Sequence, residues 1–323
     1  MPEDRVPAES PRPTISIVTP SYNQAAYLRS ALDSVLNQQG LGTEFDLDYV
    51  VMDGGSTDGA AEIVQEYADR LSDWVSEPDD GHYAAINAGF EKTSGDIMGW
   101  LNSDDMYCPW ALRTVAGIFA QNPDVAWLTA GQPILWARDG CCAWVSTPLY
   151  FSTASLLDAA HINDGAFPFL GFLQQESTFW RRELWDALCT ERAAEEPDAP
   201  PGALRPRFSL AGDHDLWLRF AAHAEPATSK VPLGGFRKQP DQRSGQMDRY
   251  LDQAKQAVAE ARATAGLPPR NAPQKPFPRW QDYARRLGMG PLAIKGRYQG
   301  RVYKVEDAGA ERTRWVPQTV AFP

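Results

Sequence analysis

Short apolar runs alternate with segments of helical periodicity through the first 130 residues. The predicted strands are 14–19, 49–52, 74–76 and 97–101, all rich in apolar or β-branched residues. Apolar side chains recur at helical spacing in 24–38, around Ile63 and Leu71, in 84–90 and after Pro109. This alternation predicts an α/β fold, a Rossmann-like and mostly parallel sheet with helices on both faces.

The pattern is looser beyond about residue 130. Residues 167–180 are rich in aromatic residues and Gly, while 191–206 are acidic and Pro-rich, which favours a surface insertion. Two further helices are predicted at 213–222 and 250–263. We therefore expect a flexible segment 1–13, a main domain 14–245 with halves 14–130 and 131–245, and a C-terminal helical extension and tail 246–323.

Composition narrows the function classes. The net charge of −11 argues against nucleic acid as a partner, since phosphate backbones are bound by clustered Lys and Arg. The chain contains no apolar run near the roughly 20 residues that cross a bilayer, and its first residues lack a signal-peptide core. We expect a cytoplasmic protein with reduced thiols at Cys108, Cys141, Cys142 and Cys189, because no zinc or disulfide spacing is evident; peripheral membrane contact stays possible.

Polar clusters follow the predicted strands at their carboxyl ends, where ligands bind in folds of this kind. The first, 19–23, is interpreted as a strand-to-helix turn with Asn23 as helix cap, or as a place where the Tyr22 ring stacks on a base; its residues alone favour the turn. The second, 53–58, suits a tight turn close to a ligand. Ser56 replaces a required glycine of the dinucleotide fingerprint, and Asp53 suits a hydrogen bond to a base or ribose.

The third cluster, Asn102-Ser103-Asp104-Asp105, is the most informative. Two adjacent carboxylates after a buried strand repel each other unless a cation or donor compensates them. A Mg²⁺ or Mn²⁺ ion held by one or two carboxylates and substrate phosphates would do so. A solvated turn is the alternative, but the position after 97–101 favours the metal.

The fourth cluster surrounds Asp213, near the start of a predicted helix. A carboxylate there is favoured by the helix dipole and often only caps. The functional interpretation is a general base, because an ordinary Asp, with a pKa of about 3.9, is ionised at neutral pH. His214 could be a metal ligand, but a lone histidine more often packs or hydrogen-bonds.

Taken in order, these clusters resemble the family 2 glycosyltransferases, which have the GT-A fold. The matching segments are TPSYNQ, YVVMDGGSTDG, SEPDDGHYAAINAGF, GDIMGWLNSDD, QQESTFW and GDHDLWLRF, and together they span roughly 15–243. Two positions depart from the commoner pattern. Gln239 stands where a histidine is frequent, and Gly212 replaces an acidic residue that often precedes the base.

The resemblance implies roles for individual residues. It implies donor contacts at Thr19, Pro20, Tyr22, Asp53, Ser56, Asp79, His82, Asn87, Ser103, Asp104 and Arg237, in a nucleotide-binding half 14–130 and a later diphosphate loop. It also implies a metal ligand at Asp105, with Asp104 beside it, a base at Asp213 with Asp215 as the alternative, and acceptor contacts at Gln175 and Trp180 in the half 131–245.

The predicted function is an inverting transfer of a hexosyl or N-acetylhexosaminyl group from a nucleotide-diphosphate sugar, most simply a UDP-sugar, to an acceptor hydroxyl. The cofactor would be Mn²⁺ or Mg²⁺, and the acceptor a glycan or lipid-linked glycan of surface polysaccharide synthesis. A non-catalytic nucleotide-sugar-binding protein is the alternative. An NAD-type oxidoreductase is disfavoured by the missing glycine fingerprint.

Overall fold

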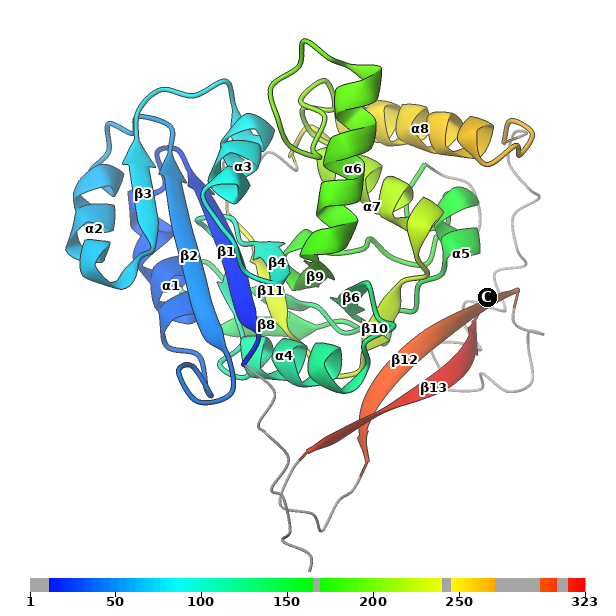
Figure 1. Cartoon of the computed structure of the whole chain (residues 1–323), viewed down its shortest axis with the longest axis horizontal. Coiled ribbons are helices and arrows are strands. Elements are labelled where there is room, and N and C mark those ends of the chain that lie inside the picture. The colour runs from blue at the N-terminus through cyan, green and yellow to red at the C-terminus, as the bar shows by residue number, and fades with distance from the viewer. Residues whose placement is uncertain (1–11, 165–168, 240–244, 271–296, 307–312, 323) are drawn as a thin grey trace, which may run out of the picture.

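The computed structural model describes residues 12–164, 169–239, 245–270, 297–306 and 313–322 (Figure 1). In these ranges a nine-stranded sheet has the order β13-β12-β10-β6-β9-β4-β1-β2-β3. Its strands are β1 (Thr14–Ser21), β2 (Asp46–Asp53), β3 (Asp73–Ser76), β4 (Ile97–Trp100), β6 (Trp127–Ala130), β9 (Thr178–Arg181), β10 (Ala227–Ser229), β12 (Tyr298–Glu306) and β13 (Arg314–Phe322). Strand β9 is antiparallel to β4 and β6, and β13 to β12, while the other pairs are parallel.

A smaller sheet lies beside the main one and consists of β5 (Met106–Tyr107), β11 (Gly234–Arg237), β7 (Ile134–Trp136) and β8 (Cys142–Val145). Strand β5 directly follows the acidic pair Asp104-Asp105, and it pairs antiparallel with β11. The pairing therefore brings the loop after residue 233 to the end of β4.

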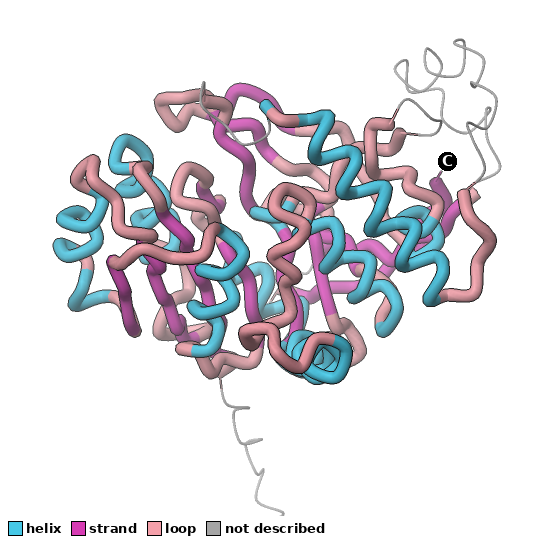
Figure 2. Tube along the Cα trace, turned by 90° about the horizontal axis from the view of Figure 1, so that it is seen from above, coloured by secondary structure: helices cyan, strands magenta, loops and turns pink. Residues whose placement is uncertain are grey.

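Helices cover both faces of the main sheet, as Figures 1 and 2 show. One apolar core joins the sheet to α1 (Ala25–Leu36), α2 (Ala60–Glu66) and α4 (Ala111–Gln121). The other core joins it to α3 (His82–Glu91), α5 (Thr153–Leu157), α6 (Arg182–Glu195), α7 (Gly212–His223) and α8 (Met247–Thr264). None of these helices is long and apolar enough to cross a membrane.

Four buried tryptophans fix α7 on the sheet. The ring of Trp217, on α7, stacks on Trp100 at a centroid distance of 5.7 Å and on Trp127 at 5.9 Å, and Trp180 lies against both Trp100 and Trp217. Aromatic side chains of this size contribute much of a core's stability. This packing holds the first turn of α7 near the carboxyl end of β4.

The α/β class and the mostly parallel sheet are confirmed, and each predicted strand of the first half is present. Two local predictions are wrong. Asn23 does not cap α1: its φ is +52°, and its side chain accepts a hydrogen bond from the N–H of Thr57 at 2.9 Å. Helix α2 ends at Glu66, and a separate 3₁₀ turn, Ala68–Arg70, precedes Leu71.

Two segments of the second half also differ from expectation. Helix α6 continues to Glu195, and 202–205 are buried against the body, so 191–206 is not simply a surface insertion. The C-terminal region contains α8 as predicted, but 298–306 and 314–322 form the hairpin β12–β13, which joins the main sheet through β10. Periodicity did not indicate this hairpin because most of its residues are exposed or half-buried, so its apolar positions do not alternate regularly.

Candidate active site

A cavity of about 750 Å³ opens at the carboxyl ends of β1, β2 and β4. Ligand sites of small molecules commonly have volumes in this range. The predicted residues in its wall are Pro20, Tyr22, Asp79, His82, Ser103, Asp104, Gln175 and Asp213. Those that lie outside its wall are Thr19, Asp53, Ser56, Asn87, Asp105, Trp180, Asp215 and Arg237.

Asp53 and Ser56 shape the loop after β2. The Asp53 carboxylate accepts hydrogen bonds from the N–H of Ser56 at 3.0 Å and the hydroxyl of Ser76 at 2.7 Å. The loop places Gly54 in the cavity wall, where an added Cβ would lie 2.8 Å from the Asp79 carboxylate. A side chain at position 54 would therefore make the Asp79 carboxylate move from this position.

Three other residues that were predicted to contact the donor or the acceptor contact other parts of the protein instead. The Thr19 hydroxyl lies 2.9 Å from the Tyr49 hydroxyl, and the Asn87 amide exchanges hydrogen bonds with the backbone of Leu204, at 2.9 and 3.1 Å. Trp180 belongs to the aromatic core described above. These three side chains lie outside the cavity lining and contribute to the packing around it.

The acidic pair after β4 has two different environments. Asp104 lines the cavity and accepts a hydrogen bond from the side-chain amide of Gln239. Asp105 is only 1% exposed and accepts from the N–H of Arg237 at 2.8 Å and the Asn102 amide at 3.1 Å. The Arg237 guanidinium donates to the carbonyl of Asp104 at 2.6 Å, so β11 secures this turn.

A third carboxylate, Glu176, joins this acidic cluster. It is 3% exposed, and its Oε1 has no hydrogen-bond partner within the described ranges. Burial raises the pKa of Glu176 to about 8, with the charges of Asp213 and Asp104 adding to the effect. Burial, followed by the charges of Asp104 and Glu176, raises the pKa of Asp105 well above its ordinary value. In the sequence, only its position next to Gln175 marks Glu176 as a candidate site residue.

This cluster fits a divalent cation that is shared with a diphosphate. The carboxylates destabilise one another's ionised forms, and a cation would relieve that repulsion. In the part of the chain that the structure describes, no set of three or more His, Cys, Asp or Glu side chains is arranged to hold a metal. An ion bound by Asp104 or Asp105 together with phosphate oxygens needs no such set, because Mg²⁺ usually keeps substrate or water ligands.

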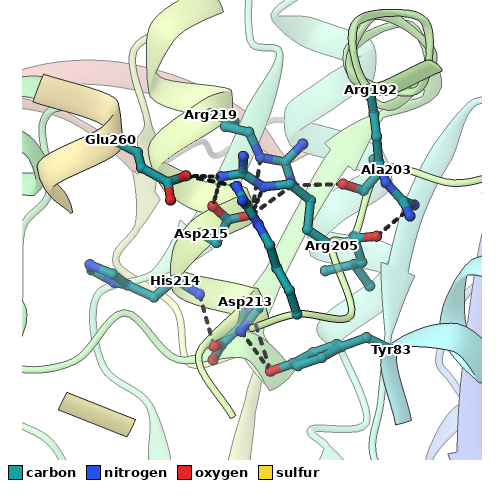
Figure 3. A network of polar contacts seen from close by, with 12 residues as sticks. Tyr83, Arg192, Ala203, Arg205, Asp213, His214, Asp215, Arg219 and Glu260 are labelled. Atoms are coloured by element: carbon teal, nitrogen blue, oxygen red, sulfur yellow. Dashed lines mark hydrogen bonds and ion pairs between the residues drawn. The ribbon is translucent and has the colours of Figure 1, made fainter. Parts of the chain in front are cut away.

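The two candidate bases on α7 differ sharply (Figure 3). Asp213 lines the cavity, and its Oδ1 accepts from the N–H of His214 at 2.8 Å. Asp215 is 1% exposed and forms ion pairs with Arg205 and, at 2.9 Å, with Arg219. Burial lowers the pKa of His214 to about 4, so this histidine is neutral at pH 7.

Four residues that line the cavity each carry one buried polar atom that has no partner among the described residues. These atoms are Ser21 Oγ, Trp100 Nε1, Asn102 Oδ1 and Gln175 Oε1. Buried polar atoms are normally hydrogen-bonded, and exceptions of this kind need an explanation such as an absent ligand or water.

Replacing Glu176 by Gln should change how the stability of the metal-free protein depends on pH. Folding raises the pKa of Glu176 from 4.5 to about 8, so between these values the folded protein binds the extra proton and wild-type stability falls as pH rises. The Gln variant lacks this loss. Chemical denaturation at pH 5 and at pH 8.5 should therefore show a stability advantage of the variant that grows with pH.

The exposed Glu62 on α2 provides the matched Glu-to-Gln control. A difference between wild type and the Glu176 variant that is the same at both pH values would contradict the raised pKa.

Comparison with known proteins gives a consistent result. Residues 16–133 match the model of "Glycosyl transferase family 2". An uncharacterized glycosyltransferase of Mycobacterium tuberculosis is 35% identical over 226 residues, which are 69% of this chain and 75% of that protein. An uncharacterized glycosyltransferase of Nostoc sp. is 32% identical over 136 residues, 41% of each chain. This chain spans less than half the length of the Nostoc relative.

Among solved structures, a fragment of S. aureus TarS (residues 1–349) in complex with UDP-GlcNAc has a TM-score of 0.53 at 16% identity. The match covers 79% of this chain and 68% of that one. At this identity the likeness concerns the fold, which is that of a GT-A glycosyltransferase.

Proposed function

The chain belongs to glycosyl transferase family 2, and from this premise we propose that it transfers a hexosyl or N-acetylhexosaminyl group from a UDP-sugar to an acceptor hydroxyl, with inversion. One observation carries the proposal. A single cavity is lined both by Asp104, next to Asp105, and by Asp213 at the start of α7. A site for a charged diphosphate and a candidate base therefore face the same space.

The donor would lie against the first half of the chain. Tyr22 is 64% exposed at the cavity and can stack on a base. Asp79, before α3, and His82, the first residue of α3, can contact the sugar nucleotide. The crystallised complex of TarS with UDP-GlcNAc supports a UDP-sugar as the donor. Arg237 and Gln239 would act indirectly, by holding the turn that carries Asp104 and Asp105.

Asp213 would take the proton from the acceptor hydroxyl as that oxygen attacks the anomeric carbon. A single displacement from the face opposite the diphosphate inverts that carbon. Mn²⁺ or Mg²⁺, held by Asp104 and Asp105, would neutralise charge on the departing diphosphate when bound. Gln175, which lines the cavity, would lie on the acceptor side of the site.

The biological setting that we propose is the cytoplasm, with a glycan or lipid-linked glycan as acceptor, in the synthesis of surface polysaccharide. The net charge of −11 supports a non-nucleic-acid partner. An acceptor carried on a lipid would require only transient contact with a membrane surface.

A thermal-shift panel tests donor and metal together. A ligand at about 100 times its Kd stabilises the folded state by about 2.7 kcal/mol. UDP with Mn²⁺ should therefore raise Tm more than GDP or dTDP with Mn²⁺, since UDP is the proposed donor nucleotide and should bind with the lowest Kd. Asp104→Ala should remove the dependence of the UDP shift on Mn²⁺. Asp69, which is exposed on the 3₁₀ turn after α2, offers a matched Asp-to-Ala control. If no nucleotide moves Tm with or without metal, the proposal is wrong.

A further inference from the structure

The start of α7 is held by side chains from two other helices. The first N–H groups of a helix have no partner within it. Here the N–H groups of Gly212 and Asp213 donate to the Tyr83 hydroxyl, at 3.1 and 3.4 Å, and that hydroxyl donates to the carbonyl of Leu210 at 3.2 Å. Figure 3 shows the Tyr83 ring extending to the N-terminal end of α7, with its hydroxyl beside Asp213.

A second side chain completes the arrangement. The amide oxygen of Gln253, on α8, accepts from the N–H groups of Leu210 at 2.8 Å and Ala211 at 3.2 Å. The backbone N–H groups of four consecutive residues, 210–213, are therefore all satisfied by two side chains, two by Gln253 and two by Tyr83. One of these comes from the donor-side helix α3 and the other from the C-terminal helix α8.

The contact between Tyr83 and α7 is close enough to determine the residue at position 212. A Cβ added to Gly212 would lie 2.6 Å from Cε2 of the Tyr83 ring. Such an approach to a buried ring would displace the ring or the helix. Gly212, which departs from the commoner acidic residue before the base, is thus the partner that this position of the tyrosine requires.

Tyr83 also connects the base to the segment that would bind the donor. It is the second residue of α3 and lines the cavity together with Asp79 and His82, and its ring packs edge-on against that of His82 at 5.0 Å. A shift of this segment would therefore be passed to Asp213 through one hydroxyl group.

We propose that Tyr83 is a positioning residue, whose hydroxyl fixes the first turn of α7 and so sets the place of Asp213 relative to the bound donor. This inference rests on the proposed function. Its basis is the set of three hydrogen bonds and the close fit to Gly212.

The test is Tyr83→Phe, which keeps the ring and removes only the hydroxyl. Transfer from a UDP-sugar should fall about 10- to 100-fold in kcat, since a displacement of about 1 Å can cost 10²-fold. The KM for the donor and the Kd for UDP should stay within about twofold of wild type, because no proposed donor contact is lost. Tyr67→Phe is the matched control: its hydroxyl bonds to Asp33, between α2 and α1 and outside the cavity wall.

A double-mutant cycle with Asp213→Asn separates positioning from a general structural effect. If Tyr83 acts through Asp213, adding Tyr83→Phe to the Asp213→Asn variant should lower the residual rate little further. As a second route, Gly212→Ala should reproduce the kcat loss by pushing on an intact Tyr83.

Three results would overturn the inference: wild-type kcat in Tyr83→Phe, an equal loss on the Asp213→Asn background, or loss of UDP binding together with kcat. Each leaves the proposed function standing as long as the wild type transfers sugar and Asp213→Asn lowers that transfer by about 10²-fold or more. A wild-type protein that neither binds UDP nor transfers sugar would instead overturn the proposed function, and this inference with it.

Discussion

Asp213→Asn is expected to lower transfer by about 10²–10⁴-fold, the range that a general base supplies. An amide has the size of the carboxyl group and can still accept the hydrogen bond from the N–H of His214, so the first turn of α7 should keep its form. It cannot take a proton from an acceptor hydroxyl. Because Asp213 faces the cavity and this local hydrogen bond survives the change, we expect Tm and UDP affinity near those of wild type.

The measurement is release of UDP from a UDP-sugar in the presence of an acceptor found by screening glycans and lipid-linked glycans. UDP affinity, measured in parallel with Mn²⁺, separates loss of chemistry from loss of binding. Near-normal transfer by the Asp213→Asn variant would remove Asp213 from the mechanism. That result would favour another residue as the base. Absence of transfer by the wild type itself would instead favour the non-catalytic binding function.

The architecture of the first half follows from local patterns. Strands β1, β2 and β4 are short apolar runs between helical segments, and the polar residues after them had to meet at one edge of a parallel sheet. That rule was enough to bring Ser103, Asp104 and Tyr22 to the cavity. The rule holds because strand direction decides at which edge of the sheet a loop emerges. The alternation of strands with helices indicates that these strands run parallel.

The rest of the site depends on contacts between residues far apart in the chain. Asp53 and Asn87 sit at the strand end and helix face that suit ligand contacts, yet Ser76 and Leu204 occupy their polar atoms. Glu176 gains its raised pKa from neighbours that the fold supplies. A sequence pattern shows which groups are available, but their partners are set by packing, which no local period encodes.

The second large effect concerns the other aspartate of the same helix. Asp215→Ala is expected to destabilise the protein by about 3–5 kcal/mol, the cost of removing one member of a buried ion pair. Asp215 accepts hydrogen bonds from Arg205 Nε at 3.0 Å and Arg219 Nε at 3.1 Å. Without it, Arg219, whose side chain is 18% exposed, loses its carboxylate partner, and Arg205, 10% exposed, keeps only Glu260.

The consequence extends beyond the pair itself. Arg219 also donates to the carbonyl of Ala203 at 2.6 Å, and Arg205 pairs with Glu260 of α8 at 3.2 Å, so Asp215 links α7 to the loop before it and to the C-terminal helix (Figure 3). Loss of the carboxylate should loosen both. Burial already lowers the pKa of the Arg219 guanidinium, which indicates how much its charge depends on a nearby anion.

Urea denaturation and Tm measure this effect, with Asp213→Ala as the matched control two residues away. At roughly 2–4 °C per kcal/mol for a large domain, the Asp215→Ala variant should melt at least about 6 °C below wild type, and the control within a few degrees of it. Equal destabilisation by the two variants would mean that the ion pairs of Asp215 contribute no more than the cavity-facing carboxylate of Asp213. The opposite pattern would reverse the roles assigned here: Asp215→Ala would lose transfer but keep its Tm, and Asp213→Ala would be strongly destabilised. We expect the two aspartates to differ in function because the side chain of Asp213 lines the cavity, whereas that of Asp215 lies between two arginines.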